Sequence, residues 1–404
     1  MKISTGRTRF LAALVGVALA GSTVSPALAG TSTSGSGGAG TSTSGGAGRQ
    51  SVAACTGAGM DPAAMVAAIQ GLPSAEATAA QVRVNSGAGC WTGRSGVADL
   101  RTGAPVPDGA RFRIGSVTKV FTATVVLQLV AEGRVGLDVP VQRYLPRLLP
   151  ADYPAVTVRQ LLDHTSGLPS PTLPDGVEWQ LAHRFDRWTP EQIVRAALRN
   201  ERAFEPGDKQ HYTNMGYIVA GMLIERVTGH SYAHEMRERI FEPLGLRDTY
   251  VPGADPTIRG PHAHGYQTVS RNGRTTLVDV TNWSQTMTPA AGDMISTLAD
   301  LDTFLRELFA GRLLPAAQLD EMFTLPETSD GEPALYSIGL TAFPLPTGEV
   351  LWGKSGARWG YSTAIAASRD GTLRAVYSVN STDAKGDTQP AITERIIGAA
   401  LSMR

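Results

Sequence analysis

The sequence is poor in cysteine, in lysine and in net charge. Its 404 residues include only two cysteines, Cys55 and Cys90, and neither has a histidine near it in the sequence, which argues against a catalytic cysteine. Acidic and basic residues number 36 each, so no excess of positive charge is present for binding nucleic acid or an anionic membrane. A hydrophobic content of 42% and a charged content of 18% exclude collagen-like, fully disordered and multi-span membrane proteins and allow a large core.

The first 29 residues are typical of a secretory signal peptide. Three basic residues, Lys2, Arg7 and Arg9, precede an apolar run over residues 10–20, and small side chains suited to cleavage end at Ala29. The alternative, a membrane anchor, requires about 20 apolar residues, roughly twice this run, and no later segment is apolar enough to span a bilayer. We therefore expect cleavage behind Ala29, secretion of the mature protein and no stable membrane insertion.

The composition changes again before the folded part of the chain. Residues 30–50 are almost wholly Gly, Ser, Thr and Ala, which is typical of a flexible linker, so the folded domain is expected over residues 51–404. Cys55 and Cys90 both follow the export signal and should meet an oxidising compartment, which predicts a disulfide between them. Such a bridge would stabilise the fold by about 3–4 kcal/mol through the entropy of the unfolded chain. Two separate buried thiols are the alternative.

Strand-like patterns occur near both ends of the folded part, and helix-like patterns lie between them. Strands are predicted over residues 81–85, 96–100, 336–343, 349–352, 362–368 and 373–380. Helices are predicted over residues 61–70, 117–131, 191–199, 214–227, 296–309 and 391–401. Helices and long loops dominate residues 140–325. This order predicts an α/β protein, with one antiparallel sheet built from both termini and flanked by helices, plus an all-helical lobe.

Ser116 and Lys119 form the first of three motifs that could carry chemistry. They stand at the start of the helix over residues 117–131, which is apolar almost all round and is therefore expected to be buried. A spacing of three places the hydroxyl and the amine on one helix face, and the helix N-terminus favours negative charge on the serine oxygen. A lysine buried beside other cations is held neutral and can take the serine proton. An N-cap serine with an incidental lysine is the alternative.

Tyr212 and Asn214 form the second motif, ahead of an apolar helix. Two residues apart in extended chain, they would project into one cleft, where the hydroxyl relays a proton and the amide binds a substrate peptide bond. Lys354-Ser-Gly356 forms the third motif, in which the lysine would face the cleft and the glycine would let a substrate backbone approach. The alternatives are a helix-entry tyrosine with an Asn cap, and an exposed lysine at a strand end.

The three motifs together resemble a known family. Two of only five lysines fall in ordered, correctly spaced motifs, which has a chance on the order of one in a few hundred. The order Ser-x-x-Lys, Tyr-x-Asn and Lys-Ser-Gly resembles that of the active-site-serine penicillin-recognising enzymes, the secreted D-alanyl-D-alanine carboxypeptidases and class C β-lactamases. The resemblance covers roughly residues 55–404 and implies the β-lactamase/DD-peptidase-like fold. Supporting segments are residues 113–116, 161–168, 291–296, 353–356 and 360–361.

The resemblance also implies a role for each residue of the motifs. Ser116 would attack a carbonyl and become acylated, while Lys119 and Tyr212 would share the proton transfers. Asn214 would hold the substrate amide. The third motif would supply Lys354 for positive potential, Ser355 for the terminal carboxylate of the substrate, Gly356 for close approach, and the backbone N–H of Ala357, with that of Ser116, for the oxyanion. No metal and no organic cofactor is implied.

Two departures from the family pattern bear on specificity. Ser355 stands where the family usually has threonine, which keeps the hydroxyl and loses a methyl group. Soluble carboxypeptidases of this kind bind the substrate carboxylate with an arginine in the strand before the third motif, and residues 336–343 contain none. Arg358, two residues beyond Gly356, is our candidate to replace it, because a guanidinium can pair with both oxygens of a carboxylate. A surface arginine on a mobile loop is the alternative.

We therefore expect a secreted, monomeric serine DD-carboxypeptidase that acts on peptidoglycan stem peptides and binds β-lactams, with no nucleic-acid partner. A class C-like β-lactamase or a promiscuous serine esterase for other small acyl substrates shares every motif, and a penicillin-binding sensor would acylate and stop. Outside the motifs, His262 and His264 lie in a Pro/Gly loop and are expected to face solvent, and His164 to support a loop. Trp283 either lines the cleft or packs in the core.

Overall fold

The computed structural model describes residues 62–174, 176–386 and 389–403. The expected signal peptide over residues 1–29, the expected linker over residues 30–50 and Cys55 lie outside the described residues, so secretion and the pairing of Cys55 with Cys90 stay predictions. None of the helices in the described part of the chain combines the length and the apolar character of a membrane span.

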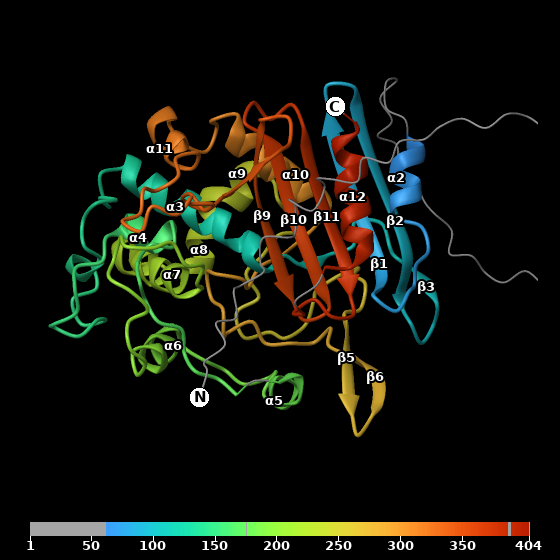
Figure 1. The fold of residues 1–404 in the computed structure, drawn as a ribbon, viewed down its shortest axis with the longest axis horizontal. Coiled ribbons are helices and arrows are strands. Elements are labelled where there is room, and N and C mark those ends of the chain that lie inside the picture. Colours follow the sequence, from blue (N-terminus) through green and yellow to red (C-terminus); the bar gives the residue numbers. More distant parts are fainter. Residues whose placement is uncertain (1–61, 175, 387–388, 404) are drawn as a thin grey trace, which may run out of the picture.

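Strands from both ends of the chain form one antiparallel sheet (Figure 1). Its strand order is β3-β2-β1-β11-β10-β9-β8, and each neighbouring pair is antiparallel. The early and late strands meet where β1 pairs with β11, with Val82 opposite Tyr377. The α/β class and the sheet shared by both termini are thereby confirmed. The strands are β1 Ala77–Ser86, β2 Gly89–Asp99, β3 Ala104–Pro105, β8 Thr341–Pro344, β9 Val350–Arg358, β10 Tyr361–Ser368 and β11 Arg374–Ser381.

The two faces of the sheet bury different cores, because successive side chains of a strand point to opposite faces. In β10, Ala364 packs with α2 (Pro62–Ala68) and α12 (Ala391–Leu401), which cover one face. The next residue, Ile365, packs into the larger core of the other face, which includes α10 (Leu298–Phe309) and the helices of the lobe. The sheet is therefore sandwiched between terminal helices and the helical lobe (Figure 1).

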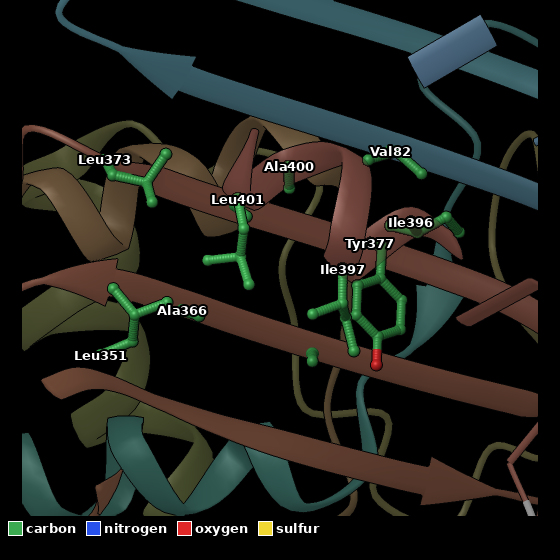
Figure 2. A pocket seen from close by; sticks show the side chains of 11 residues that line it. Val82, Leu351, Ala366, Leu373, Tyr377, Ile396, Ile397, Ala400 and Leu401 are labelled. Atoms are coloured by element: carbon green, nitrogen blue, oxygen red, sulfur yellow. The ribbon is translucent and has the colours of Figure 1, made fainter. Parts of the chain in front are cut away.

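A small pocket opens between α12 and the sheet (Figure 2). Its lining is apolar apart from the hydroxyl of Tyr377, and α12 contributes Ile396, Ile397, Ala400 and Leu401 to it. The pocket lies on the α12 face of the sheet, whereas α3 and the serine motif belong to the core on the opposite face. It is therefore separate from the candidate site described below.

The helix predicted over residues 117–131 is the centre of the larger core. It is observed as α3, Thr118–Ala131, and the 3-10 turn η1, Gly115–Val117, leads into it. Polar side chains inside this buried helix find backbone partners, since the Thr122 hydroxyl donates to the Ala290 carbonyl oxygen over 2.6 Å. The helix stops before Gly133, whose φ of 69° is left-handed. The expected buried central helix is thus confirmed.

The helices around α3 begin and end at the residues that the sequence indicates. The capping box formed by Thr189 and Gln192 opens α6 (Pro190–Ala197). Gly229, with a left-handed φ of 80°, ends α7 (Met215–Thr228). The remaining helices are α4 Val158–Leu162, α5 Val177–Ala182, α8 Tyr232–Met236, α9 Glu242–Leu244 and α11 Ala316–Glu321, with the single turns η2 Val141–Arg143 and η3 Arg237–Phe241.

Residues 140–325 are mainly helical, as expected, but not entirely. They contain a β-hairpin of β5 (Tyr266–Arg271) and β6 (Arg274–Asp279), which lies beside α5 (Figure 1). Its turn is Asn272-Gly273, with φ values of 50° and 74°, a sequence that favours such hairpins. Because β6 is almost wholly exposed, its side chains lack the apolar alternation that predicts a strand.

Two further differences from the sequence prediction concern elements that position the site. A short pairing of β4 (Phe112–Arg113) with β7 (Ile295–Ser296) ties the segment before β7 to the segment before Ser116. The third motif lies inside β9, which extends to Arg358 and not only to residue 352 as predicted. The strand predicted over residues 336–343 is only β8, because Gly339 takes a left-handed φ of 86° that breaks an extended chain.

Candidate active site

Ser116 lies in the turn η1, partly exposed, beside the part of β9 that extends beyond its pairing with β8. Its Oγ is 2.7 Å from the Tyr212 hydroxyl oxygen and 3.1 Å from Lys119 Nζ. The turn of helix between residues 116 and 119 brings hydroxyl and amine onto one face, as the spacing predicts. Tyr212 arrives from the segment ahead of α7, so the structure joins the first and second motifs around one oxygen atom.

Lys119 is fully buried at the start of α3. Its Nζ is 2.7 Å from the Asn214 side-chain oxygen and 2.7 Å from the Ala291 carbonyl oxygen, in addition to its contact with Ser116. Burial holds the pKa of Lys119 well below its ordinary range, and nearby cations lower it further. These cations are Lys354, Lys385 and Arg358, and the carboxyl of Asp293 opposes them.

In its neutral form Lys119 can act as a base towards Ser116. Its two N–H groups would then donate to the oxygen atoms of Asn214 and Ala291, which would leave the lone pair for Ser116. The Ser116 hydroxyl can then donate its proton to Lys119 while it accepts a hydrogen bond from Tyr212. This is the arrangement that a general base and its nucleophile require.

The ring of Tyr212 is packed among aromatic and cationic groups. His164 lies 4.5 Å away and Tyr336 5.3 Å away between ring centroids. The Nζ atoms of Lys354 and Lys119 lie 4.8 Å and 5.0 Å from the centre of the Tyr212 ring. Burial raises the pKa of Tyr212 further above its ordinary value. The hydroxyl is therefore protonated, so it serves as a donor to Ser116 and not as the base.

The third motif lies on the part of β9 that faces Ser116. Lys354 is buried, and this burial lowers its pKa to about 7. A Cβ placed on Gly356 would come within 2.1 Å of the Ile114 carbonyl oxygen and 2.8 Å of the Ser116 backbone nitrogen. Only glycine lets the two backbones approach this closely. The packing of β9 on the turn η1 therefore requires glycine here, and the approach of a substrate backbone to Gly356 stays a prediction.

Ala357 presents its backbone to the same edge. A Cβ on Gly115, whose φ is 51°, would meet the Ala357 backbone nitrogen at 2.7 Å and its carbonyl oxygen at 3.0 Å. Because N–H and C=O of one strand residue point to the same edge, both groups of Ala357 face the turn that carries Ser116. The backbone N–H groups of Ser116 and Ala357 thus lie on neighbouring segments, where an oxyanion hole would need them.

Arg358 and Asp293 are two buried ionisable residues that interact electrostatically. Arg358 is the last residue of β9 and is 8% exposed, so it does not lie on a surface loop, the alternative raised by the sequence. Its Nε and Asp293 Oδ1 have no hydrogen-bond partner within the described part of the chain. Burial raises the pKa of Asp293 to about 7, and the charges of Arg358 and Lys119 partly offset this rise. A role of Arg358 in binding a carboxylate stays a prediction.

Sequence reasoning missed two charged groups of the site, Asp293 and Lys385. Lys385, from the segment between β11 and α12, places its Nζ 2.9 Å from the Ala357 carbonyl oxygen. No local pattern marks it, and the scarcity of lysine was the only available signal.

His164, expected to support a loop, is buried with a φ of 66°, and its Nδ1 accepts a hydrogen bond from the Thr213 backbone N–H over 3.3 Å.

The residues set aside in the sequence have partners other than Ser116. His262 and His264 were expected to face solvent, but both are half-buried. His264 Nδ1 is 2.7 Å from Asp279 Oδ2. Trp283 is buried and stacks on Trp359 at 5.2 Å, within a small apolar cluster, which favours the core-packing alternative.

One cluster in the described part of the chain has ligand atoms close enough for a metal ion. His230, His234 and Glu235 place these atoms within 4.8 Å of one another. The Glu235 carboxylate is already engaged by Arg239 at 2.5 Å, and Arg237 lies 3.4 Å from His234 Nδ1. Two guanidinium groups beside the cluster oppose the binding of a cation.

The fold and the arrangement around Ser116 together define a class: serine hydrolases built on the β-lactamase fold. Residues 51–399 match the Beta-lactamase family, and the chain belongs to that family. The resemblance to penicillin-recognising enzymes is thereby confirmed.

Three similar proteins illustrate the range of the family. The chain is 29% identical to Penicillin-binding protein 4* of Bacillus subtilis over 300 residues, 70% of this chain and 64% of that protein. It is 34% identical to Esterase EstB of Burkholderia gladioli over 177 residues, 40% of this chain and 43% of the esterase. Both matches span less than two thirds of the relative. The structure of a D-stereospecific amidohydrolase from Streptomyces sp. is 36% identical, covers 84% of this chain and 98% of its own, and superposes with a TM-score of 0.73.

Proposed function

We propose that the chain is a serine DD-carboxypeptidase that forms an acyl-enzyme on Ser116 and releases the last residue of peptides ending in D-alanyl-D-alanine. The observation that carries the proposal is the position of the Ser116 Oγ between the Lys119 amine and the Tyr212 hydroxyl, beside the edge of β9. A penicillin-binding relative and a D-stereospecific amidohydrolase of the same fold support an amide beside a D-configured centre as the substrate.

Each proton transfer in the proposed mechanism has a group in reach. Ser116 Oγ attacks the carbonyl carbon as its proton moves to Lys119, and the backbone N–H groups of Ser116 and Ala357 stabilise the negative charge on the carbonyl oxygen. Tyr212 protonates the leaving amine as the C–N bond breaks. The proton that Lys119 took from Ser116 then returns to Tyr212, whose ring centre lies 5.0 Å from Lys119 Nζ. A water molecule then attacks the ester with the same groups acting in reverse.

The substrate carboxylate would be bound by the cations and the hydroxyl of β9. Lys354 lies near Tyr212, on the leaving-group side, and Ser355 follows it in β9. The buried Arg358 at the end of β9 would add a second positive charge. A carboxylate next to the Lys354 ammonium would also keep that lysine charged above its lowered pKa of about 7. The three groups replace the arginine that β8 lacks.

Three assays on the purified protein test this proposal. We expect D-alanine release from a diacylated Lys-D-Ala-D-Ala peptide, slow turnover of nitrocefin, and a lasting adduct with a fluorescent penicillin. Intact-mass spectrometry should find one adduct, which Ser116→Ala abolishes. Rapid nitrocefin turnover without D-alanine release would establish a β-lactamase instead, and an adduct without either activity would establish a sensor. An adduct that persists in Ser116→Ala would remove Ser116 as the nucleophile.

An esterase is the second candidate, and one observation favours it. Among the residues of β8, Thr341–Pro344, none is cationic, so this strand offers nothing to bind a free carboxylate. An ester with a neutral leaving group would not need such a contact, and a relative is an esterase. Comparing kcat/KM for a p-nitrophenyl ester with that for the D-alanyl-D-alanine peptide decides between the two, because an esterase would turn over only the ester.

Export and assembly complete the proposal. We infer that cleavage behind Ala29 yields a secreted monomer, with the 30–50 linker ahead of the folded domain. The mass of the protein in the culture medium of an expressing bacterium, and its elution in size-exclusion chromatography, test the two statements separately.

A further inference from the structure

Lys385 places a cation directly on the edge of the candidate active site. It lies between β11 and α12, and its Nζ donates to the Ala357 carbonyl oxygen over 2.9 Å. Two residues just before Lys385 are anchored by hydrogen bonds. The Thr382 hydroxyl donates to the Ala75 carbonyl oxygen over 2.6 Å, and the Asp383 carboxylate accepts from the Gln267 side chain over 3.0 Å. The ammonium group is therefore brought to Ala357 by a fixed segment.

The carbonyl oxygen that Lys385 contacts faces the reacting atoms. The backbone nitrogen and oxygen of Ala357 both lie against Gly115, the residue before Ser116. A substrate whose carbonyl oxygen enters the oxyanion hole must bring its neighbouring atoms past Ala357. Those atoms would meet both the Ala357 carbonyl oxygen and the ammonium group of Lys385.

The position of Tyr212 indicates which part of the substrate passes Lys385. Tyr212 donates the proton to the leaving amine in the proposed mechanism, so the leaving group lies beside Tyr212 and Lys354. The acyl part lies on the other side of the scissile bond, along β9 towards Ala357. Lys385 is thus adjacent to the part of the substrate that stays on Ser116.

The charge on Lys385 is available to a ligand. Its side chain is exposed, and within the described part of the chain no carboxylate forms an ion pair with it. Desolvation of the ammonium end, together with repulsion from Arg358, lowers the pKa of Lys385 to about 7. An incoming anion would favour the charged form of Lys385. The ammonium group has three donors and uses one on Ala357, so two remain for the anion.

We propose that Lys385 is a specificity-determining residue that binds an anionic group, a carboxylate, on the acyl part of the substrate. This rests on the proposed function, and it adds a substrate class: acyl donors with a carboxylate next to the amide that passes Ala357. The Ala357 carbonyl oxygen accepts the N–H of that amide, and Lys385 pairs with the carboxylate beside it.

Benzylpenicillin and carbenicillin form a matched pair for testing this inference. Carbenicillin differs only by a carboxylate on the side-chain carbon beside the acyl amide. The second-order rate of Ser116 acylation by each compound is measured by intact-mass spectrometry in the unmodified protein and in Lys385→Met, which keeps the length and removes the charge. Lys209→Met, which removes an exposed lysine in another part of the chain, is the control.

We expect Lys385→Met to slow carbenicillin at least tenfold more than benzylpenicillin, Lys385→Arg to restore most of this preference, and Lys209→Met to leave both rates unchanged. Equal slowing of both compounds would mean that Lys385 only orients Ala357, and it would overturn the inference, as would unchanged rates. Failure of both compounds to acylate the unmodified protein would overturn the proposed function itself, an outcome distinct from a loss of preference.

Discussion

Gly356 and Ser116 are so close that a Cβ on Gly356 would stand 2.8 Å from the Ser116 backbone nitrogen. The two segments involved, β9 and the turn η1, also carry the two N–H groups of the proposed oxyanion hole, those of Ser116 and Ala357. Gly356→Ala should therefore push the segments apart and slow Ser116 acylation by about a hundredfold or more. Overpacking should lower the free energy of unfolding by about 1–3 kcal/mol. Acylation kinetics and thermal unfolding check the two effects.

Gly398→Ala is the matched control for this substitution. Gly398 lies in α12, and a Cβ there would meet nothing within 4 Å. Acylation should be unchanged, and stability should rise by up to about 1 kcal/mol because alanine favours a helix more than glycine does. Normal acylation of Gly356→Ala would contradict the close packing of β9 on the turn.

Tyr212→Phe should separate leaving-group protonation from nucleophile activation. The Tyr212 hydroxyl donates to Ser116, and its raised pKa keeps it protonated. The variant should lose about 10²–10⁴-fold in kcat on an amide substrate, whose leaving amine needs a proton. A p-nitrophenyl ester should lose much less, because p-nitrophenolate leaves without one.

Tyr336→Phe controls for the aromatic packing, since the Tyr336 ring lies 5.3 Å from that of Tyr212 and both hydrogen-bond partners of Ser116 stay in place. It should retain both activities. If Tyr212→Phe slowed amide and ester equally, Tyr212 would act in activating Ser116 and not on the leaving group.

Lys119 should set the acid limb of the pH–rate profile. Burial and the charge of Lys354 hold its pKa well below the ordinary lysine range, so the neutral base should persist far below pH 10. Lys354→Met removes a neighbouring positive charge that is present below pH about 7. The pKa of Lys119 should then rise, and the limb should move to higher pH. Acylation rates between pH 5 and 9 measure the shift, and an unmoved limb would exclude Lys119 as the titrating base.

Local patterns predicted the elements of the site better than its surroundings. The helix α3 was predictable because it is apolar on all sides, and the pairing of Ser116 with Lys119 because it depends only on one helical turn. The contact between Ser116 and Tyr212 joins residues far apart in the sequence, and it was predicted only through the resemblance to a family.

Lys385 and Asp293 were missed because long-range packing alone brings them to Ser116. Lys385 reaches Ala357 through the order of strands in the sheet, which no local pattern encodes. Asp293 belongs to the segment before β7, and the short pairing of β7 with β4 ties that segment to the serine turn. The β5–β6 hairpin was missed for a different reason, since its Asn-Gly turn was visible but its exposed strands were not.

Asp293 should make the protein less stable as the pH rises. Burial raises its pKa from 3.8 to about 7, so the folded state keeps a proton that the unfolded chain has already lost in this interval. The free energy of unfolding should therefore fall between pH 4 and 7, by at most on the order of 4 kcal/mol for this group. Asp293→Asn should flatten that slope, as measured by urea unfolding at each pH. Asp152→Asn, at an exposed position, should not, and an equal slope in both variants would contradict the buried, protonated carboxyl.

Arg358 should distinguish substrates by the charge of their leaving end. Its guanidinium is buried with an unpartnered Nε, and burial lowers its pKa only to about 10, so it stays charged at neutral pH. If it binds the substrate carboxylate, Arg358→Ala should cost roughly 1.5–3 kcal/mol on a peptide ending in free D-alanine, about tenfold or more in kcat/KM, and little on the corresponding amide.

Two further variants keep this test independent of folding. Arg358→Gln keeps a polar side chain at the buried position and loses less volume than the alanine variant, and Arg369→Ala removes an exposed arginine paired with Asp320. The glutamine variant should lose the preference for the free acid as the alanine variant does, because the loss of charge decides it. Arg369→Ala should retain the preference. A loss of equal size on acid and amide, or no loss on either, would assign Arg358 to supporting Asp293 and would favour an esterase that needs no carboxylate on its substrate.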